Sequence, residues 1–164
     1  MKRIGLLSDT HGYLLPQLFR FFEGVDEIWH AGDIGNINIA LELENFRPMR
    51  AVYGNVDTIE IRARYKETDV FTCGEMKIFM THIGGYPGRY ARGIKSALRT
   101  EKPDIFISGH SHILKIMPDP ELDLLHINPG SAGKSGLHKK ITMIRFLAEK
   151  DKIRELEVFD MKRY

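Results

Sequence analysis

The amino-acid sequence predicts a layered α/β sandwich. In the first two-thirds of the chain, short apolar runs typical of buried strands alternate with segments whose apolar residues recur at helical spacing. In the last third, strand-like segments follow one another without a helical pattern between them. Alternating strands and helices followed by consecutive strands indicate an α/β core that is continued by antiparallel strands.

The first two-thirds contain the predicted helices. Apolar residues at helical spacing mark one helix at Leu14, Leu15, Leu18, Phe19 and Phe22, and a second at Ile39, Ala40, Leu43 and Phe46. A third helix is expected over residues 90–101 and ends before Pro103. The strands predicted between them are residues 3–8, 27–31, 50–53, 76–81 and 105–108.

The last third of the chain is predicted to contain strands and no helix. The polar segment Glu149-Lys150-Asp151-Lys152 predicts a hairpin connection between the last two strands. The predicted strands are residues 113–117, 124–128, 141–148 and 153–159.

Composition places the chain among globular proteins. The sequence has 164 residues, of which 43% are apolar and 28% charged, so disorder is excluded as the main state. No repeat or Pro/Gly/Ser-rich linker divides it, and we expect a single domain over residues 1–164. The formal net charge of +2 argues against a surface dedicated to nucleic acid.

Membrane and secretion signals are weak. No stretch approaches the ~18 apolar residues of a transmembrane helix, and the apolar run before Ser8 is too short for a signal peptide. Cys73 is the single cysteine, which is compatible with a reducing compartment. We expect a soluble cytoplasmic protein that is not associated with membranes.

Five short polar motifs each follow the end of a predicted strand. Ligands of open α/β sheets bind in the crevice beyond the carboxyl ends of the strands, so motifs far apart in sequence are expected to meet at one site. The motifs are Asp9-Thr10-His11, Gly32-Asp33, Gly54-Asn55, Thr81-His82 and Gly109-His110-Ser111-His112.

These motifs supply carboxylate, amide and imidazole ligands. Manganese, iron, nickel and zinc accept this mixture of oxygen and nitrogen atoms, and we expect manganese first. One metal ion could take Asp9, His11 and His112, and a second could take Asn55, His82 and His110. Asp33 would bridge the two, since a carboxylate offsets the repulsion between cations held roughly 3.5–4 Å apart.

The charge of such a centre points to the substrate. Two divalent cations against two carboxylates leave a formal charge of about +2, which suits a phosphate oxyanion. Metal binding also lowers the pKa of water toward ~7 and so supplies hydroxide for in-line attack on phosphorus.

Each motif alone has an ordinary structural explanation. Asp-x-His is common in turns and caps, Gly-Asp and Gly-Asn are turn dipeptides, and a lone His82 is more often structural than a ligand. The occurrence of all five after strand ends favours the metal site.

In this order the motifs resemble those of the calcineurin-like metallophosphoesterases. The short chain and Asn128-Pro129-Gly130-Ser131 resemble the small prokaryotic, YfcE-like phosphodiesterase branch. The resemblance implies a four-layer αββα sandwich with mixed sheets, a two-metal centre and phosphoester hydrolysis by a bridging hydroxide. It implies Asp33, Asn55 and His82 as catalytic residues, and as metal ligands Asp9, His11, Asp33, Asn55, His82, His110 and His112.

The sequence departs from that family at two places. Larger members carry a histidine directly after Gly-Asn, where this chain has Val56 followed by Asp57. Valine cannot donate a proton, and an exposed aspartate is a weak substitute because it is ionised at neutral pH. We therefore expect a preference for acidic leaving groups. The segment Ile83-Gly84-Gly85 also differs from the usual glycine directly after the histidine.

Other features have competing explanations. Gly133-Lys134-Ser135 completes most of a phosphate-loop motif, but strand-like residues follow it where that loop requires a helix. Residues 84–92 form either a rim that presents arginine to phosphate or a surface loop leading into a helix. His30 is expected in the core or behind a ligand, and His126 and His138 are expected to be structural or exposed.

Two other functions remain open from the sequence. One is a non-catalytic scaffold for protein interaction, as in the retromer subunit of this fold, although that subunit is altered at ligand positions. The other is a phosphomonoesterase or nucleotide pyrophosphatase with the same centre. The expected partner is a phosphoester small molecule or nucleotide, and apolar residues on the terminal strands could form a homodimer.

Overall fold

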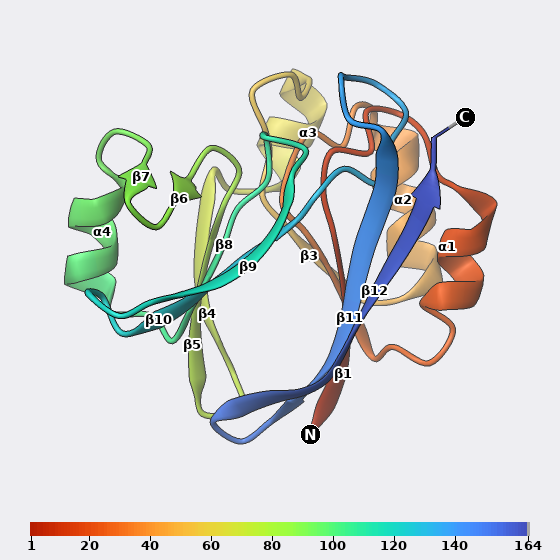
Figure 1. Ribbon diagram of the computed structural model, residues 1–164. Helices are drawn as coiled ribbons and strands as arrows, with labels where there is room; N and C mark the ends of the chain where they lie inside the picture. The colour runs from red at the N-terminus through yellow and green to blue at the C-terminus, as the bar shows by residue number, and fades with distance from the viewer. Residues whose placement is uncertain (164) are drawn as a thin grey trace.

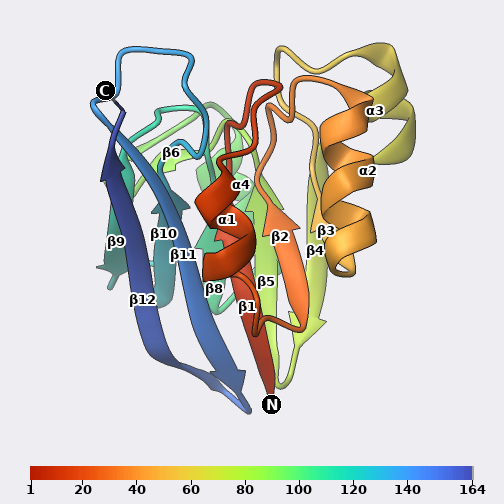
Figure 2. The same cartoon turned by 90° about the vertical axis from the view of Figure 1, so that its right-hand side faces the viewer.

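Two five-stranded sheets face each other in the computed structural model, which describes residues 1–163 (Figure 1). The first sheet has the order β12-β11-β1-β2-β3 and the second β4-β5-β8-β10-β9. Helices α1 and α2 cover the outer side of the first sheet, and α4 lies outside the second (Figures 1 and 2). The four-layer α/β sandwich is therefore confirmed.

The first sheet is mixed. Strands β1, β2 and β3 are parallel, whereas β11 is antiparallel to β1 and β12 is antiparallel to β11. Their bounds are β1 (Lys2–Leu7), β2 (Glu27–His30), β3 (Met49–Ala51), β11 (Lys140–Glu149) and β12 (Lys152–Lys162).

The second sheet has the same plan. Strands β5, β8 and β10 are parallel, with β4 antiparallel to β5 and β9 antiparallel to β10. Their bounds are β4 (Thr68–Cys73), β5 (Met76–Thr81), β8 (Ile105–Ile107), β9 (Leu114–Asp119) and β10 (Leu124–Pro129).

The remaining elements lie outside the two sheets. They are α1 (Pro16–Phe21), α2 (Ile37–Phe46), α3 (Ile59–Arg64), α4 (Ile94–Glu101) and the short hairpin of β6 (Gly85–Tyr86) and β7 (Arg89–Tyr90). Among residues 1–163, no helix is long and apolar enough to cross a membrane.

The buried apolar side chains form three clusters, because side chains along a strand alternate between the two faces of its sheet. Successive side chains of a strand point to opposite faces, so Ile4 and Leu6 of β1 pack between the sheets while Leu7 packs toward the helices. The cluster beneath α1 and α2 includes Leu18, and the cluster beneath α4 includes Leu98. Apolar side chains are therefore packed on both faces of each sheet around β1 and β8. This packing holds the parallel strands in place, so the loops that follow their carboxyl ends start from rigid positions.

The structure differs from the predicted secondary structure in the bounds of one helix, and it contains elements that were not predicted. The helix expected over 90–101 begins at Ile94, because residues 85–90 form the β6–β7 hairpin instead. Helix α3 and strand β4 were not predicted. Only Ile61 is buried in α3, so it has no apolar periodicity, and β4 is an edge strand with mixed polar residues.

The C-terminal predictions agree with the structure. The polar segment 149–152 is the turn between β11 and β12, with Lys150 in the left-handed region at φ 51°. The segment after Gly133-Lys134-Ser135 leads into strand β11 and not into a helix, so it is not a phosphate loop.

Candidate metal centre

The five sequence motifs meet at one end of the sandwich. Each lies within four residues of the end of a parallel strand: Asp9 follows β1, Asp33 follows β2, Asn55 follows β3, His82 follows β5 and His110 follows β8. These carboxyl ends lie at the top of Figure 1, opposite the N-terminus.

Six of the seven predicted ligand residues form two groups. In each group the candidate ligand atoms lie within 4.8 Å of one another. One group is Asp9, His11 and His112, and the other is Asp33, His82 and His110. This grouping could hold two cations, although the role of each residue as a ligand stays a prediction.

The two aspartates join the groups into one cluster. Asp33 Oδ2 lies 3.1 Å from His82 Nε2 and 3.7 Å from His11 Nε2. Asp9 Oδ1 lies 3.2 Å from His112 Nε2 and 3.8 Å from His82 Nε2. Each carboxylate is therefore within reach of both groups.

Each aspartate is anchored through one oxygen and presents the other to the cluster. Asp9 Oδ2 accepts hydrogen bonds from Ser8 Oγ at 2.6 Å and from the His110 amide at 3.0 Å. Asp33 Oδ1 accepts from the Val56 amide at 3.0 Å. The second oxygens, Asp9 Oδ1 and Asp33 Oδ2, are the atoms that face the histidines.

Hydrogen bonds fix the protonation of the His82 ring. His82 Nδ1 lies 2.7 Å from the Ala31 carbonyl oxygen, which can only accept, so Nδ1 carries the proton. In the neutral ring the Nε2 lone pair then points into the cluster. A hydrogen bond of this kind behind a metal-binding histidine sets both its tautomer and its orientation.

Left-handed backbone conformations form the loops of the cluster. Five of its residues have positive φ angles, which are uncommon outside glycine. The angles are 55° at Asp9, 47° at His11, 54° at Asp33, 68° at His110 and 60° at His112. Such conformations persist only where the surroundings enforce them, and they concentrate at functional sites.

Bonds between the loops enforce this geometry. The Asp9 amide donates to the Gly32 carbonyl at 2.9 Å, and the His11 amide donates to the Asp33 carbonyl at 3.0 Å. Glycine is required at Gly32, because an added Cβ would lie 2.6 Å from the His82 ring. The loops after β1 and β2 therefore position the two aspartates as one unit.

The electrostatics favour charged carboxylates. Burial by itself would raise the pKa of Asp9, but contacts with His11 and His112 and the charge of His82 hold it well below its usual range. Asp33 is also buried, and its contact with His82 lowers its pKa. In turn, Asp9 raises the pKa of His11. The cluster thus contains two anionic groups in low-dielectric surroundings.

Two buried atoms of the cluster lack a hydrogen-bond partner among the described residues. They are Asp9 Oδ1 and His82 Nε2. Leaving buried polar atoms unpaired costs free energy, and each such atom in a native structure calls for a partner. Anionic oxygen and imidazole nitrogen are ligands that borderline divalent metals accept, so these residues fit divalent cations.

Asn55 lies apart from the two groups. Its side chain is exposed and makes no hydrogen bond to the described residues, while its carbonyl oxygen accepts from Arg62 Nη2 at 3.1 Å. The loop nevertheless touches the cluster, because the neighbouring Val56 amide binds Asp33. The role predicted for the Asn55 side chain stays a prediction.

The expectation for Asp57 was wrong. Asp57 is buried, with 5% of its surface exposed. Its Oδ1 accepts from the Gly35 amide at 2.9 Å, and its Oδ2 accepts from the Gly54 amide at 2.7 Å. Asp57 is therefore a brace between the loops after β2 and β3 and not an exposed acid near the leaving group.

His30 lies behind the cluster, as expected. Its ring is fully buried, accepts from the Gly32 amide at 3.1 Å and lies 3.0 Å from Thr10 Oγ1, so the neutral ring donates to Thr10. Burial lowers the pKa of His30 to about 4, which agrees with this neutral form. His126 is buried in the second sheet and is structural.

Further residues support the cluster; the sequence had indicated the Asn128–Ser131 motif but not the role of His138. His138 contacts the cluster through His112, with their Nδ1 atoms 3.1 Å apart. Asn128 Nδ2 donates to the Gly109 carbonyl at 2.9 Å, and Ser131 Oγ donates to the Asp9 carbonyl at 3.0 Å. The motif from Asn128 to Ser131 thus holds the loops that carry His110, His112 and Asp9.

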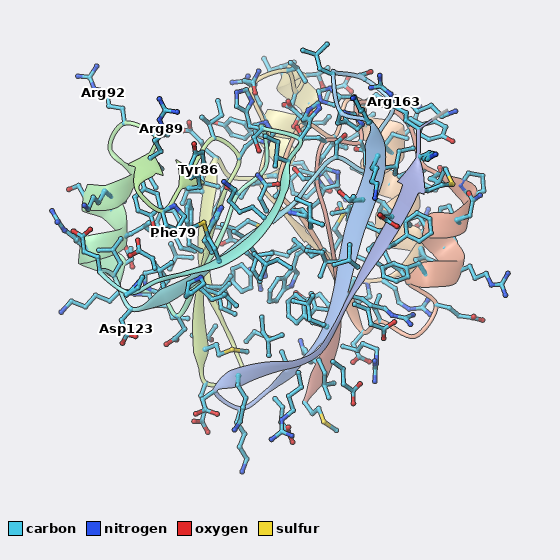
Figure 3. The ribbon with its side chains drawn as sticks, viewed as in Figure 1. Phe79, Tyr86, Arg89, Arg92, Asp123 and Arg163 are labelled. Atoms are coloured by element: carbon cyan, nitrogen blue, oxygen red, sulfur yellow. The ribbon has the colours of Figure 1, made fainter. Side chains whose placement is uncertain are left out.

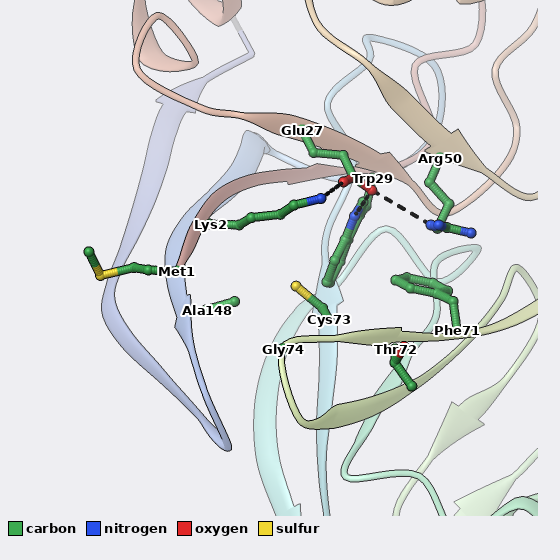
Figure 4. A pocket seen from close by; sticks show the side chains of 10 residues that line it. All are labelled: Met1, Lys2, Glu27, Trp29, Arg50, Phe71, Thr72, Cys73, Gly74 and Ala148. Carbon is green, nitrogen blue, oxygen red and sulfur yellow. Dashed lines mark hydrogen bonds and ion pairs between the residues drawn. The ribbon is translucent and has the colours of Figure 1, made fainter.

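A separate cavity lies at the opposite end of the sandwich. It has a volume of about 190 Å³ and is lined by Lys2, Trp29 and Cys73 among others (Figure 4). Glu27 binds Lys2 Nζ at 3.0 Å and Trp29 Nε1 at 2.9 Å in its wall. Burial raises the pKa of the Cys73 thiol, so this cavity offers no activated nucleophile.

Comparison with known proteins identifies the class. Residues 1–151 match the calcineurin-like phosphoesterase superfamily domain, and the chain belongs to that family. A protein of Methanothermobacter thermautotrophicus named a probable metallophosphoesterase is 35% identical over 138 residues, which is 78% of this chain and 76% of the relative.

Solved structures show the same fold. The Escherichia coli phosphoesterase YfcE is similar with a TM-score of 0.62 and 19% identity, covering 87% of each chain. Vps29 of Entamoeba histolytica complexed with zinc is similar with a TM-score of 0.75 and 17% identity, covering 99% of each chain. The expected resemblance to YfcE-like phosphoesterases is confirmed.

Proposed function

We propose that the protein is a phosphodiesterase that depends on two divalent cations, with manganese as the first candidate. The observation that carries this proposal is the joined cluster of Asp9, Asp33 and four histidines, with buried atoms that lack partners. When bound, two cations supply a hydroxide nucleophile for in-line attack and offset the charge of the phosphoryl group.

The residues of the chain have separate tasks in this proposal. Asp33 holds the two halves of the site together through its Oδ2 atom, which faces both His11 and His82. His82 is held by the Ala31 carbonyl oxygen at Nδ1, so that its Nε2 faces the site. Asn55 stands on the loop beside Asp33 and would reach a phosphoryl oxygen of the substrate.

No side chain supplies a proton to the leaving group at the position after Asn55. Val56 is apolar with 52% of its surface exposed, and its amide is committed to Asp33. The carboxylate of Asp57 is occupied by two backbone amides. The arrangement therefore favours esters whose leaving group departs as an anion.

The test is hydrolysis of bis-p-nitrophenyl phosphate by metal-stripped protein before and after addition of Mn²⁺. Asp33→Asn removes the charge shared by both groups, and we expect it to lose a metal and nearly all hydrolysis while the fold is retained. Asp160→Asn, an exposed aspartate on β12, is the matched control. Full activity in Asp33→Asn would refute the bridging role.

A scaffold function is the second candidate. Exposed apolar side chains lie close in sequence to the residues of the metal centre, on its loops and at the start of α3, and such residues are typical of interaction surfaces. They are Val56, Ile59, Ile83, Ile113 and Leu137. Metal binding without turnover of any phosphoester would favour the scaffold function. A phosphomonoesterase or nucleotide pyrophosphatase would use the same centre and would differ from the proposed phosphodiesterase only in its substrate. The homodimer expected through the terminal strands stays a prediction.

A further inference from the structure

A cavity of about 490 Å³ opens beside the metal centre. Asn55 and His82 stand in its wall, so a phosphoester bound at the centre would extend part of its structure into it. The volume lies in the range of small-molecule binding sites. Its wall also includes Tyr53, Arg62 and Arg92.

Among the residues that the structure describes, no carboxylate pairs with the positive charge of Arg62. Its guanidinium donates to backbone carbonyl oxygens alone: Nε to Asp57 at 2.9 Å, and Nη2 to Asn55 at 3.1 Å and to Gly54 at 3.4 Å. These bonds fix the guanidinium beside the Asn55 loop and over the Tyr53 ring, 4.9 Å from its centroid. Arg62 is therefore a preoriented cation in the cavity wall.

Arg92 supplies a second cation at the rim. It is exposed, forms no ion pair with the described residues and extends away from the ribbon beyond β7 (Figure 3). By contrast, Arg64 and Arg145 are paired with Glu44 and Glu157. Unpaired arginines at a cavity are the groups that bind phosphate, because their planar fork matches two phosphate oxygens.

One acidic residue also lines the cavity. Glu67 is exposed, so the wall contains two arginines against one carboxylate and has a net positive charge. Thr68 and Thr81 add side-chain hydroxyl groups, while Ile83 contributes an apolar surface. The wall therefore combines an apolar part with a positively charged part.

We infer that this cavity binds the organic arm of the substrate and recognises a second phosphate group on that arm through Arg62 and Arg92. The inference rests on the proposed phosphodiesterase function and names its substrate class: phosphodiesters that carry a further phosphate. In hydrolysis the P–O bond to the other ester group breaks and a new P–O bond forms from water. That group leaves as an anion, which is protonated in solvent according to its pKa, while the arm with its second phosphate stays on the phosphate product.

Two p-nitrophenyl esters that differ by one phosphate test this inference. They are the p-nitrophenyl ester of thymidine 5′-phosphate and the same ester with a 3′-phosphate. Both release p-nitrophenolate, so the leaving group is constant. With Mn²⁺ we expect kcat/KM to be about tenfold higher for the 3′-phosphorylated ester, mainly through a lower KM.

Variants separate the cavity from general charge effects. Arg92→Ala and Arg62→Gln are each expected to reduce this preference severalfold, and Arg92→Lys to restore part of it. The ratio of the two esters cancels any effect of Arg62→Gln on the Asn55 loop. Arg89→Ala is the matched control, since Arg89 is exposed on β7 but does not line the cavity.

Binding provides a readout that does not depend on turnover. Calorimetry with Mn²⁺ present should show tighter binding of thymidine 3′,5′-bisphosphate than of thymidine 5′-phosphate, and Arg92→Ala should remove the difference. Equal affinity and equal kcat/KM for the paired compounds would overturn the inference, as would an equal loss in Arg89→Ala. Absence of hydrolysis with the binding preference intact would instead overturn the proposed phosphodiesterase.

Discussion

The Nδ1 atom of His112 lies 3.1 Å from the Nδ1 atom of His138. His138 Nε2 lies 2.8 Å from the Gly133 carbonyl oxygen, which only accepts, so Nε2 carries the proton of a neutral His138 ring. Its Nδ1 must then accept from His112 Nδ1. In a neutral His112 ring this relay leaves Nε2 unprotonated and directed at Asp9, which is the form in which a histidine binds a metal ion.

Replacement of His138 should weaken metal binding without unfolding the protein. In His138→Phe the His112 ring loses the acceptor that fixes its tautomer, and we expect a loss of metal affinity of about 10–100-fold. Titration of metal-stripped protein with Mn²⁺ measures it. Leu137→Ala, a neighbouring exposed residue, serves as the control. Equal affinity in His138→Phe and the wild type would show that the relay has no role.

Asp57 should contribute to both stability and metal binding. In Asp57→Asn one carboxylate oxygen becomes an NH₂ group, which cannot accept from the Gly35 or Gly54 amide. An unpaired buried amide costs about 1–3 kcal/mol, which urea denaturation would detect as a lower free energy of unfolding. Because Gly54 precedes Asn55, the affinity for the second cation should fall as well.

The control for this change is Asp151→Asn, at an exposed position in the turn between β11 and β12. It alters the charge equally and should leave the free energy of unfolding within about 0.5 kcal/mol of the wild type. An Asp57→Asn protein as stable as this control would contradict the bracing role.

Hydrolysis should depend steeply on the acidity of the leaving group. Val56 and Asp57 offer no free acid, so aryl phosphodiesters should react far faster than alkyl phosphodiesters. Val56→His should raise the alkyl rate by about tenfold or more, because general acids contribute ~10²–10⁴-fold where they are well placed. Similar wild-type rates across a series of esters would refute the prediction.

The sequence was sufficient for the ends of the parallel strands and for the meeting of the motifs that follow them, because local apolar runs and motif positions encode both. It could not reveal Asp57 as a brace, since the Gly35 amide that it binds belongs to a different loop. His138 was missed for the same reason: its partner His112 lies 26 residues earlier in the chain, before β9 and β10, and no local motif links the two. Helix α3 lacks the apolar periodicity on which such predictions depend.

Buried His126 should make stability depend on pH. Burial lowers its pKa to about 4, against 6.5 for the ordinary group, and its Nε2 atom has no partner among the described residues. Between these values the unfolded chain binds a proton that the folded protein does not. Stability is therefore full above pH 6.5 and falls as the pH is lowered, by roughly 2 kcal/mol at pH 4.5.

His126→Phe removes this dependence and keeps a ring against Phe106. We expect its free energy of unfolding to fall less than that of the wild type between pH 7.5 and 4.5, by roughly that amount. Urea denaturation in the presence of a chelator measures both proteins without metal. His30 has a similarly lowered pKa and contributes equally to both, so the difference isolates His126. Parallel pH profiles would mean that His126 titrates normally in the folded protein.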